Sequence, residues 1–446
     1  MSSPSRRPAP RQLRTGSLRV GMLPLALLAA LPCGAESLRV DYVFGASLLH
    51  SDNINLSDTA PDSESVLSPE VSFEATQSGA STSFKARGRL QYLDYRDDTF
   101  NDEARGEFAG QFNWMLLPQR LNLVVEDYLG RQPVDFTAGY SPGNQQQINV
   151  FTAGPSLFAR FGEATRGQLD FRYSDTYAEE TREFNGNRYL AAGHLFRDLG
   201  TSRWLSANIE ASRVRFDLDD PSSDYDRYDG YIGYRNESAK LDLDAAVGYT
   251  RLEQDNASGH ESSPLARVQL DWRVATRSVL SARASYQFAD TASDLVVESN
   301  RLDTLVIDDF STPTGLVGPA VYRQRRYEVG YQYTGERWDL MVRPYLERVD
   351  YNDAQIVGWK TNGGYVNVEY RLQPRLSLTA SAMLENREFN DGTREDDDTL
   401  ARIGLTYEFS RHLSGSVGEQ RRDRDSNIPG QDYRENVATV SISYRR

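Results

Sequence analysis

The sequence predicts an all-β protein, a single transmembrane up-and-down antiparallel β-barrel with short turns at one end and long loops at the other. Three observations predict it. Apolar side chains recur at every second position over long segments, connector lengths alternate between short and long, and an export signal opens the chain. About 20 strands are expected, with 18 as the alternative count.

The first 35 residues are predicted to be a secretory signal peptide. Five arginines and no acid precede an apolar run from Val20 to Leu31, and small residues follow up to Ala35. The run is too short to cross a bilayer as a helix, so we expect cleavage near Ala35 and a barrel formed by residues 36–446. The only cysteine, Cys33, lies in the removed segment, which excludes disulfides and thiolate metal sites from the exported part.

The overall charge excludes one class of partner. The chain has 50 basic and 64 acidic residues, a net charge of −14, and loss of the five early arginines would make it still more negative. A nucleic-acid-binding protein would carry the opposite charge. We therefore expect no nucleic-acid partner.

The period-two alternation is clearest in four segments, residues 84–92, 241–249, 376–385 and 401–409. This is the period of a strand whose two faces meet different media. No stretch of 18 or more apolar residues follows Ala35, which excludes membrane helices. A soluble β-sandwich or propeller is the alternative, but its apolar face would need a second apolar face, and no blade-length repeat is present.

Connector lengths supply the strand count. Nine short connectors alternate with longer polar ones, and nine turns at one end predict twenty strands because the first and last strands also meet that end. The short connectors are Gln77 to Ser81, Leu116 to Arg120, Gly162 to Thr165, Gly200 to Arg203, Glu237 to Lys240, Ala275 to Arg277, Gly335 to Trp338, Gln373 to Arg375 and Arg411 to Leu413. The longer ones include Ser51 to Glu64, Tyr95 to Asp102, Asp217 to Asp226, Gln254 to Ser262, Asn390 to Asp398 and Asp425 to Gln431.

The longest connector, from Ala292 to Tyr322, is predicted to fold into the mouth of the barrel. Many of its apolar side chains would meet water if it extended outward. A short outward hairpin continuing the flanking strands is the alternative. If the connector folds inward, its acids could meet arginines of the wall and narrow the lumen. The candidate constriction residues are Asp303, Asp308, Asp309 and Phe310.

Predicted inward positions carry charges of both signs. Opposite charges can pair across neighbouring strands and simply hydrate the wall. Alternatively, they form a low-affinity track for hydroxyl-rich or anionic sugar chains. The same residues serve both interpretations. The lumen-lining candidates are Arg87, Arg89, Arg172, Arg267, Arg283, Arg326, Arg343, Arg371, Arg402, Glu126, Asp242, Asp244, Glu328 and Glu369.

The sequence offers no support for catalysis or for a bound metal or cofactor. Four histidines are present, and no serine-elbow, HExxH or paired-histidine motif accompanies them. Acidic runs at Asp217, Asp219 and Asp220 and at 396–398 could attract divalent cations, but they lack calcium-loop spacing, so solvated loops are expected. We predict a protein that is not an enzyme.

Three segments near the start of the exported chain carry a family resemblance. "VFGASLLHSDNINLSD", with Gly45, Asp52 and Asn53, is followed by "SVLSPEVSFEA" and then by "YLDYRDD". Together they resemble the opening of the putative β-barrel porin family, whose members are often encoded with exopolysaccharide synthesis and export genes. The specific motifs cover about 60 residues, and the rest agrees in length and alternation.

The resemblance implies a passive Gram-negative outer-membrane conduit that takes part in Wzx/Wzy-type exopolysaccharide export. Its implied partners are outer-membrane lipid and lipopolysaccharide, the polysaccharide chain and periplasmic export components. Two alternatives stay open, a general diffusion porin and an outer-membrane anchor for surface polysaccharide.

Overall fold

The computed structural model describes residues 38–217, 224–255, 260–292 and 317–446. The predicted signal peptide and the constriction candidates Asp303, Asp308, Asp309 and Phe310 lie outside the described residues. In the described ranges, no helix has the length and apolar character needed to cross a membrane.

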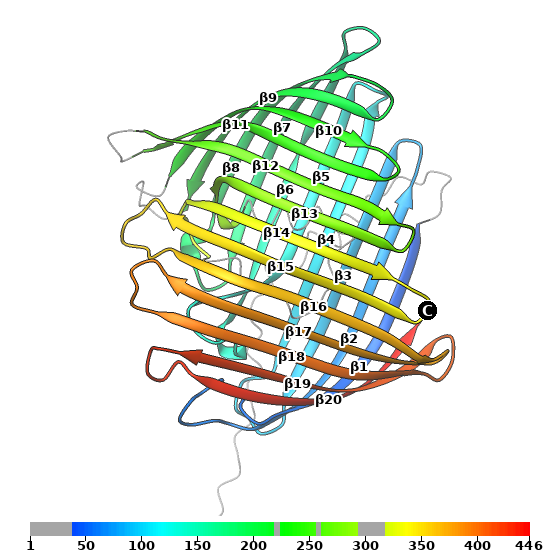
Figure 1. Cartoon of the computed structure of the whole chain (residues 1–446), viewed down its shortest axis with the longest axis vertical. Helices are drawn as coiled ribbons and strands as arrows, with labels where there is room; N and C mark the ends of the chain where they lie inside the picture. The colour runs from blue at the N-terminus through cyan, green and yellow to red at the C-terminus, as the bar shows by residue number, and fades with distance from the viewer. Residues whose placement is uncertain (1–37, 218–223, 256–259, 293–316) are drawn as a thin grey trace, which may run out of the picture. The chain divides into compact units, whose positions relative to one another are not determined.

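Within residues 36–446, the described residues form twenty antiparallel strands closed into a barrel (Figure 1). Each strand pairs with the next, and β1 pairs with β20 from Val43↔Arg445 to Ser51↔Val437. The predicted fold class is therefore confirmed, with 20 strands rather than 18. The strands are β1 (Arg39–Ser51), β2 (Glu64–Ser78), β3 (Thr82–Tyr95), β4 (Glu103–Leu117), β5 (Leu121–Pro133), β6 (Gln145–Arg160), β7 (Thr165–Ala178), β8 (Gly186–Asp198), β9 (Arg203–Phe216), β10 (Tyr225–Glu237), β11 (Leu241–Gln254), β12 (His260–Ala275), β13 (Ser278–Ala289), β14 (Tyr322–Thr334), β15 (Trp338–Tyr351), β16 (Trp359–Gln373), β17 (Leu376–Phe389), β18 (Glu395–Glu408), β19 (Leu413–Ser426) and β20 (Tyr433–Arg445). Two short 3₁₀ helices, η1 (Pro142–Asn144) and η2 (Arg182–Phe184), lie in connectors.

All nine short connectors predicted from the sequence join consecutive strands at one end of the barrel, which we call the short-turn end. The opposite end, where the longer connectors lie, is the long-loop end. This alternation follows from the up-and-down path of the chain, since each hairpin reverses its direction.

The two faces of the sheet differ as the alternation predicts. Large apolar side chains are left exposed on the outer face, including Ile209 (71%), Val247 (65%) and Val440 (57%). Side chains one residue away point inward and are mostly polar. An apolar outer belt on a closed barrel is stable where lipid surrounds it.

One acidic run differs from expectation. Residues Asn390 to Asp398 were predicted as a connector, but β18 begins at Glu395. Asp396 and Asp398 therefore point inward, where Arg394 and Arg424 pair with them. The prediction of a solvated loop is wrong for these two residues, because arginines on neighbouring positions neutralise the charges that made the run look loop-like.

The acidic run near residue 220 lies mostly outside the described ranges. Asp217 is exposed in the connector that follows β9, as predicted, whereas Asp219 and Asp220 are among the residues that are not described.

At two places in the long-loop half, the pairing between neighbouring strands stops before either strand ends and does not resume. Pairing between β4 and β5 stops at Phe108↔Leu129, and pairing between β12 and β13 stops at Ala266↔Tyr286, although these strands continue toward the loops. Pro264, just above the second break, has no amide hydrogen to contribute. By contrast, β10 and β11 stay paired along their whole length.

Side chains bridge both breaks. Gln147 Nε2 donates a hydrogen bond of 2.7 Å to the Gly106 carbonyl at the first break. Arg227 Nη1 donates one of 2.9 Å to the Phe288 carbonyl at the second. At each break, a backbone carbonyl thus accepts a hydrogen bond from a side chain in place of one from the neighbouring strand.

Gly154 on β6 is predicted to be intolerant of any side chain. A Cβ there would lie 1.9 Å from the backbone oxygen of Phe171 on β7. We expect Gly154→Ala to lower the free energy of unfolding by about 1 to 3 kcal/mol, because the backbone must shift. Gly230→Ala is the control, since an added Cβ there has nothing within 4 Å. Urea titration of the refolded barrels measures both, and equal losses would contradict the assigned register.

Candidate functional site

The lumen-lining candidates lie on the inward face, opposite the exposed apolar residues. Strand alternation and the pairing register place all of them there. They are Arg87 and Arg89 on β3, Glu126 on β5, Arg172 on β7, Asp242 and Asp244 on β11, Arg267 on β12, Arg283 on β13, Arg326 and Glu328 on β14, Arg343 on β15, Glu369 and Arg371 on β16, and Arg402 on β18.

A cluster of charged candidates centres on the buried carboxylate of Glu328. Arg283 Nη1 lies 2.7 Å from Glu328 Oε1, Arg326 Nη2 lies 3.3 Å from Oε2, and Arg343 Nε lies 3.5 Å from Oε1. Arg326 also contacts Glu347 at 3.4 Å. Three neighbouring strands therefore supply arginines to one acid, and the charges hold one another in place.

Similar contacts line the rest of the wall. They combine ion pairs, hydrogen bonds and arginine–aromatic contacts, as expected for opposite charges on facing strands. Most of the candidates thus have wall partners, which fits the paired, hydrated wall better than a row of free binding groups. The contacts include Arg89–Glu70 (2.7 Å), Arg172–Asp170 (3.2 Å), Arg371–Asp339 (3.2 Å), Arg235–Asp244 (2.7 Å), Gln111–Glu126 (2.7 Å), Arg402–Gln420 (2.5 Å) and Arg267 over the Tyr231 ring (5.0 Å).

The most specific feature is the connector between β5 and β6, residues 134–144, which we call the crossing loop. The Phe136 ring packs against Trp359 of β16, with ring centroids 4.8 Å apart, and lies 6.4 Å from the Phe389 ring of β17. In a closed ring of twenty strands, β6 and β16 lie opposite one another. The loop therefore reaches across the lumen to the far wall.

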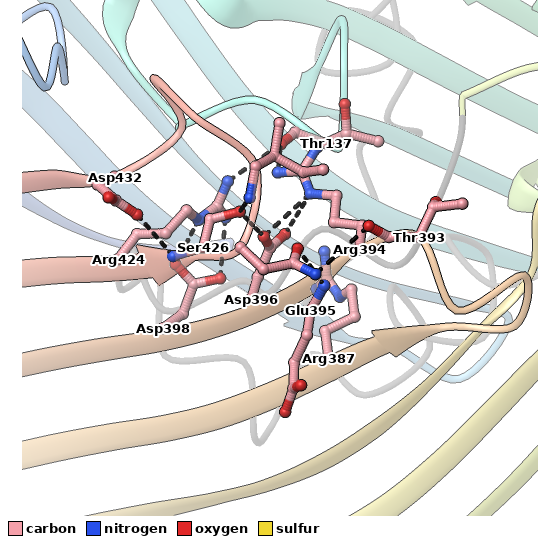
Figure 2. Close-up of polar contacts among 12 residues, drawn as sticks. Thr137, Arg387, Thr393, Arg394, Glu395, Asp396, Asp398, Arg424, Ser426 and Asp432 are labelled. Atoms are coloured by element: carbon pink, nitrogen blue, oxygen red, sulfur yellow. Dashed lines mark hydrogen bonds and ion pairs between the residues drawn. The ribbon is translucent and has the colours of Figure 1, made fainter.

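Polar contacts fix the loop at the far wall (Figure 2). The Thr137 carbonyl accepts hydrogen bonds from Arg394 Nη2 and from Arg424 Nη1, the latter at 3.1 Å. Arg394 Nε is 2.8 Å from Asp396, and Arg424 makes two bonds of 2.8 Å to Asp398. Carboxylates on β18 thus orient two guanidinium groups, and each has an N–H left for the loop. We call these five residues the latch.

The latch is itself buried and braced. Asp396 is only 1% exposed, and Ser426 Oγ donates a hydrogen bond of 2.6 Å to it. Ser426 N donates in turn to Asp432 at 2.7 Å. Charge-assisted bonds shielded from water are stronger than exposed ones.

Hydrogen bonds within the crossing loop stabilise its conformation. Asn144 Nδ2 donates to the carbonyls of Asp135 (2.7 Å) and Gly139 (3.0 Å), while Asn144 Oδ1 accepts from the Asp135 amide at 2.8 Å. A Cβ added at Gly139 would lie 3.0 Å from both Leu56 and Tyr433, so the loop sits closely on the wall. An internally bonded loop loses less entropy when it docks.

The described ends of the long connector between β13 and β14 also point inward. Ala292 and Val317 are buried in a cluster with Ile148 and Val150 of β6 and with Phe184. Just before Ala292, buried Asp290 accepts a bond of 2.6 Å from Arg188 Nη2 and one of 2.7 Å from the Tyr225 hydroxyl. The described ends of the connector thus run inward, in the direction that the prediction of an inward-folded connector requires. Its candidate constriction residues lie outside the described residues.

Sequence reasoning missed the crossing loop and its latch. The local signal was present, since Phe136 and Tyr140 are aromatic residues within a segment of Gly, Pro, Ser and Asp. Such residues in a short connector indicate that it packs onto something. Their partners on β16 to β19 could not be found from local spacing.

The described residues contain no group of three or more His, Cys, Asp and Glu side chains that could hold a metal ion. His194, on the lumen wall, contacts Asn208 at 2.8 Å and Asp170 at 3.3 Å. Its ring is part of the wall network.

A closed antiparallel barrel with an apolar outer belt, a charged lumen and an inward loop defines an outer-membrane barrel of the porin type. Residues 348–446, from the end of β15 through β20, match the family described as "Putative beta-barrel porin 2". The resemblance predicted from the sequence is thereby confirmed over these residues, which lie at the opposite end of the chain from the segments that first indicated it.

Several solved outer-membrane proteins are similar in fold. The siderophore receptor PirA from Pseudomonas aeruginosa is 12% identical, with a TM-score of 0.46 over 92% of this chain and 80% of its own. OmpT of Vibrio cholerae lacking loop L8 is 12% identical, with a TM-score of 0.35 over 92% of this chain and 99% of its own. The FrpB iron transporter from Neisseria meningitidis is 9% identical, with a TM-score of 0.42 over 91% and 81%. No curated protein matches the sequence significantly.

Proposed function

We propose that the protein is a passive outer-membrane conduit in exopolysaccharide export of the Wzx/Wzy type, with its signal peptide removed near Ala35 and its long loops outside the cell. The observation that carries this proposal is the crossing loop. A conduit wide enough for a polymer must be narrowed when idle, and here a loop crosses the lumen and is held at the far wall by a ring contact and hydrogen bonds.

The lumen chemistry supports a sugar chain as cargo. Hydroxyl groups both donate and accept hydrogen bonds, so they can exchange with the arginine–carboxylate pairs of the wall at little net cost. Weak, repeated contacts let a chain move on rather than stay bound. The porin family match supports a channel rather than an enzyme.

A general diffusion porin is the second candidate. Its supporting observation is the number of contacts that hold the crossing loop, since a permanently docked loop would pass only small solutes. In that case the loop would set a permanent size limit instead of a narrowing that is relieved when a polymer passes.

Deletion of the gene, with complementation, separates the two candidates. We expect lower surface polysaccharide and unchanged uptake of small sugars and amino acids, because the export conduit is lost while other pores remain. Unchanged polysaccharide together with slower solute uptake would instead show a general porin. Polysaccharide is measured by uronic-acid and hexose assay of the cell surface, and uptake with radiolabelled solutes.

A further inference from the structure

We propose that a hollow in the wall at the short-turn end is a binding subsite for a carboxylate-bearing sugar unit, through which an acidic polysaccharide first engages the lumen. This inference rests on the proposed function and specifies its substrate. The hollow has a volume of about 760 Å³, and its lining includes Asp271, Arg273, Ser281, Arg283, Gly330 and Arg343.

Small residues create the space. Gly330 on β14 faces Ser281 on β13, and a Cβ at Gly330 would lie 2.3 Å from Ser281 Oγ. Any larger residue at 330 would therefore project into the hollow. The size suits one or two sugar rings rather than a single ion.

The hollow contains more cationic than free anionic groups. Lys240, Arg273, Arg283 and Arg343 all line it. Arg273 Nη1 donates to the uncharged Ala239 carbonyl at 2.7 Å, so its positive charge is not neutralised there.

The acids around the hollow are largely engaged elsewhere. Glu237 and Asp242 contact Arg235, at 2.8 and 3.9 Å, which itself does not line the hollow. Glu328 is shared among three arginines, two of which line the hollow. Asp271 accepts one hydrogen bond of 3.3 Å from Gln269 Nε2 and has a second carboxylate oxygen that can accept a sugar hydroxyl.

Two guanidinium nitrogens of residues that line the hollow, Arg283 Nε and Arg343 Nε, have no hydrogen-bond partner among the described residues. Arg283 Nε is buried, while Nη1 of the same side chain holds Glu328. A buried donor without a partner costs free energy, and a ligand oxygen that met it after a small rotation of the side chain would remove that cost. Guanidinium groups bind carboxylates in a defined planar geometry, which a hydroxyl-only sugar cannot match.

The hollow lies at the short-turn mouth, where its positive charge can attract an anionic polymer that approaches the lumen. The whole chain carries a net charge of −14, which repels an acidic polymer at long range. A local cationic surface inside a low-dielectric mouth focuses the field and raises the rate of capture of an anion. The periplasmic end is where an exported polymer arrives.

The test uses the purified full-length barrel in planar bilayers. The probes are tetragalacturonate and, as its neutral counterpart, maltotetraose, each added to the short-turn side. We expect tetragalacturonate to interrupt the current about tenfold more often than maltotetraose, the lower end of the range for electrostatic capture, with a steep fall at high salt.

Two variants address the hollow by different means. Gly330→Gln fills the space without changing the charge, and Arg343→Gln removes a charge without filling it, with Arg343→Lys as the partial rescue. Both are expected to lower the frequency of tetragalacturonate block to the level of maltotetraose. Arg411→Gln, in a turn at the same end outside the hollow, is the matched control and should block like the unaltered barrel. Normal open-channel conductance shows that each variant is folded.

Equal block by the two probes, or full block in both variants, would overturn the subsite. That result would leave the export function standing, because the gene-deletion phenotype tests it separately. Selective block combined with unchanged surface polysaccharide in the deletion strain would overturn the export function and leave an acid-selective pore.

Discussion

Replacing residues 135–143 by a short Gly–Ser linker is expected to raise the single-channel conductance about two- to fivefold, because the narrowest cross-section of a water-filled pore sets its current. The crossing loop spans the lumen from β5 and β6 to β16, and the replacement removes both its aromatic anchor and the carbonyl held by the latch. Planar-bilayer recording measures the conductance. In cells, sensitivity to a bulky antibiotic should rise in parallel.

A single substitution tests whether the crossing loop must be docked on the far wall, and not merely present, to limit the current. Phe136→Ala removes the ring that packs against Trp359 and leaves every charge of the latch in place. We expect the current to fluctuate between a low and a high level, because the loop undocks part of the time. Arg421→Gln is the control, since Arg421 points outward from β19 and pairs with Asp423.

If the linker barrel folds but conducts like the unaltered protein, the crossing loop does not limit the lumen. The inward ends of the β13–β14 connector, at Asp290 to Ala292 and Val317, would then be the next segment to remove.

Val440→Arg is expected to lower the free energy of unfolding of the barrel in vesicles by about 2 to 4 kcal/mol, since it places a charge in hydrocarbon near mid-strand. Val440 is 57% exposed on the outer face of β20. The adjacent Ser441 points inward and shares a hydrogen bond of 2.7 Å with Ser416, so Ser441→Arg should be tolerated far better. Urea titrations in the presence of lipid compare the two.

Equal losses at Val440 and Ser441 would mean that β20 is turned the other way. Because pairing fixes the face of each strand relative to its neighbours, that result would reverse the inward and outward assignment of the whole barrel.

The sequence predicts the barrel well because lipid on one side and water on the other impose a strict alternation. Leu90 and Arg89 are adjacent in the chain but belong to opposite faces, and a shift of one residue would place the arginine in lipid. The strict alternation also predicts the positions of the short turns. Each short connector lies where the alternation pauses, and the structure has a hairpin at all nine.

The candidate site depends on contacts between residues that are distant in sequence. Phe136 meets Trp359 only because the ring closes. Likewise, Glu328 receives arginines from β13, β14 and β15 because the strand register aligns them, and no local spacing encodes that register. Asp396 and Asp398 resembled a loop because their arginine partners lie on other strands or at the strand end.

The two interruptions of the ladder have a mechanical consequence. A continuous ring of backbone hydrogen bonds holds a barrel at one circumference. Here the other strand pairs have at most short gaps, as at Gly154 and Pro155 of β6, and their pairing resumes on both sides. Above Phe108↔Leu129 and Ala266↔Tyr286 the pairing does not resume, so the wall there consists of two panels, β5 to β12 and β13 to β4. The side chains of Gln147 and Arg227 join the two panels by hydrogen bonds to backbone carbonyls across the breaks. The circumference of the long-loop mouth is therefore held at these two breaks by a few side chains, so we expect it to widen more readily than the base of the barrel.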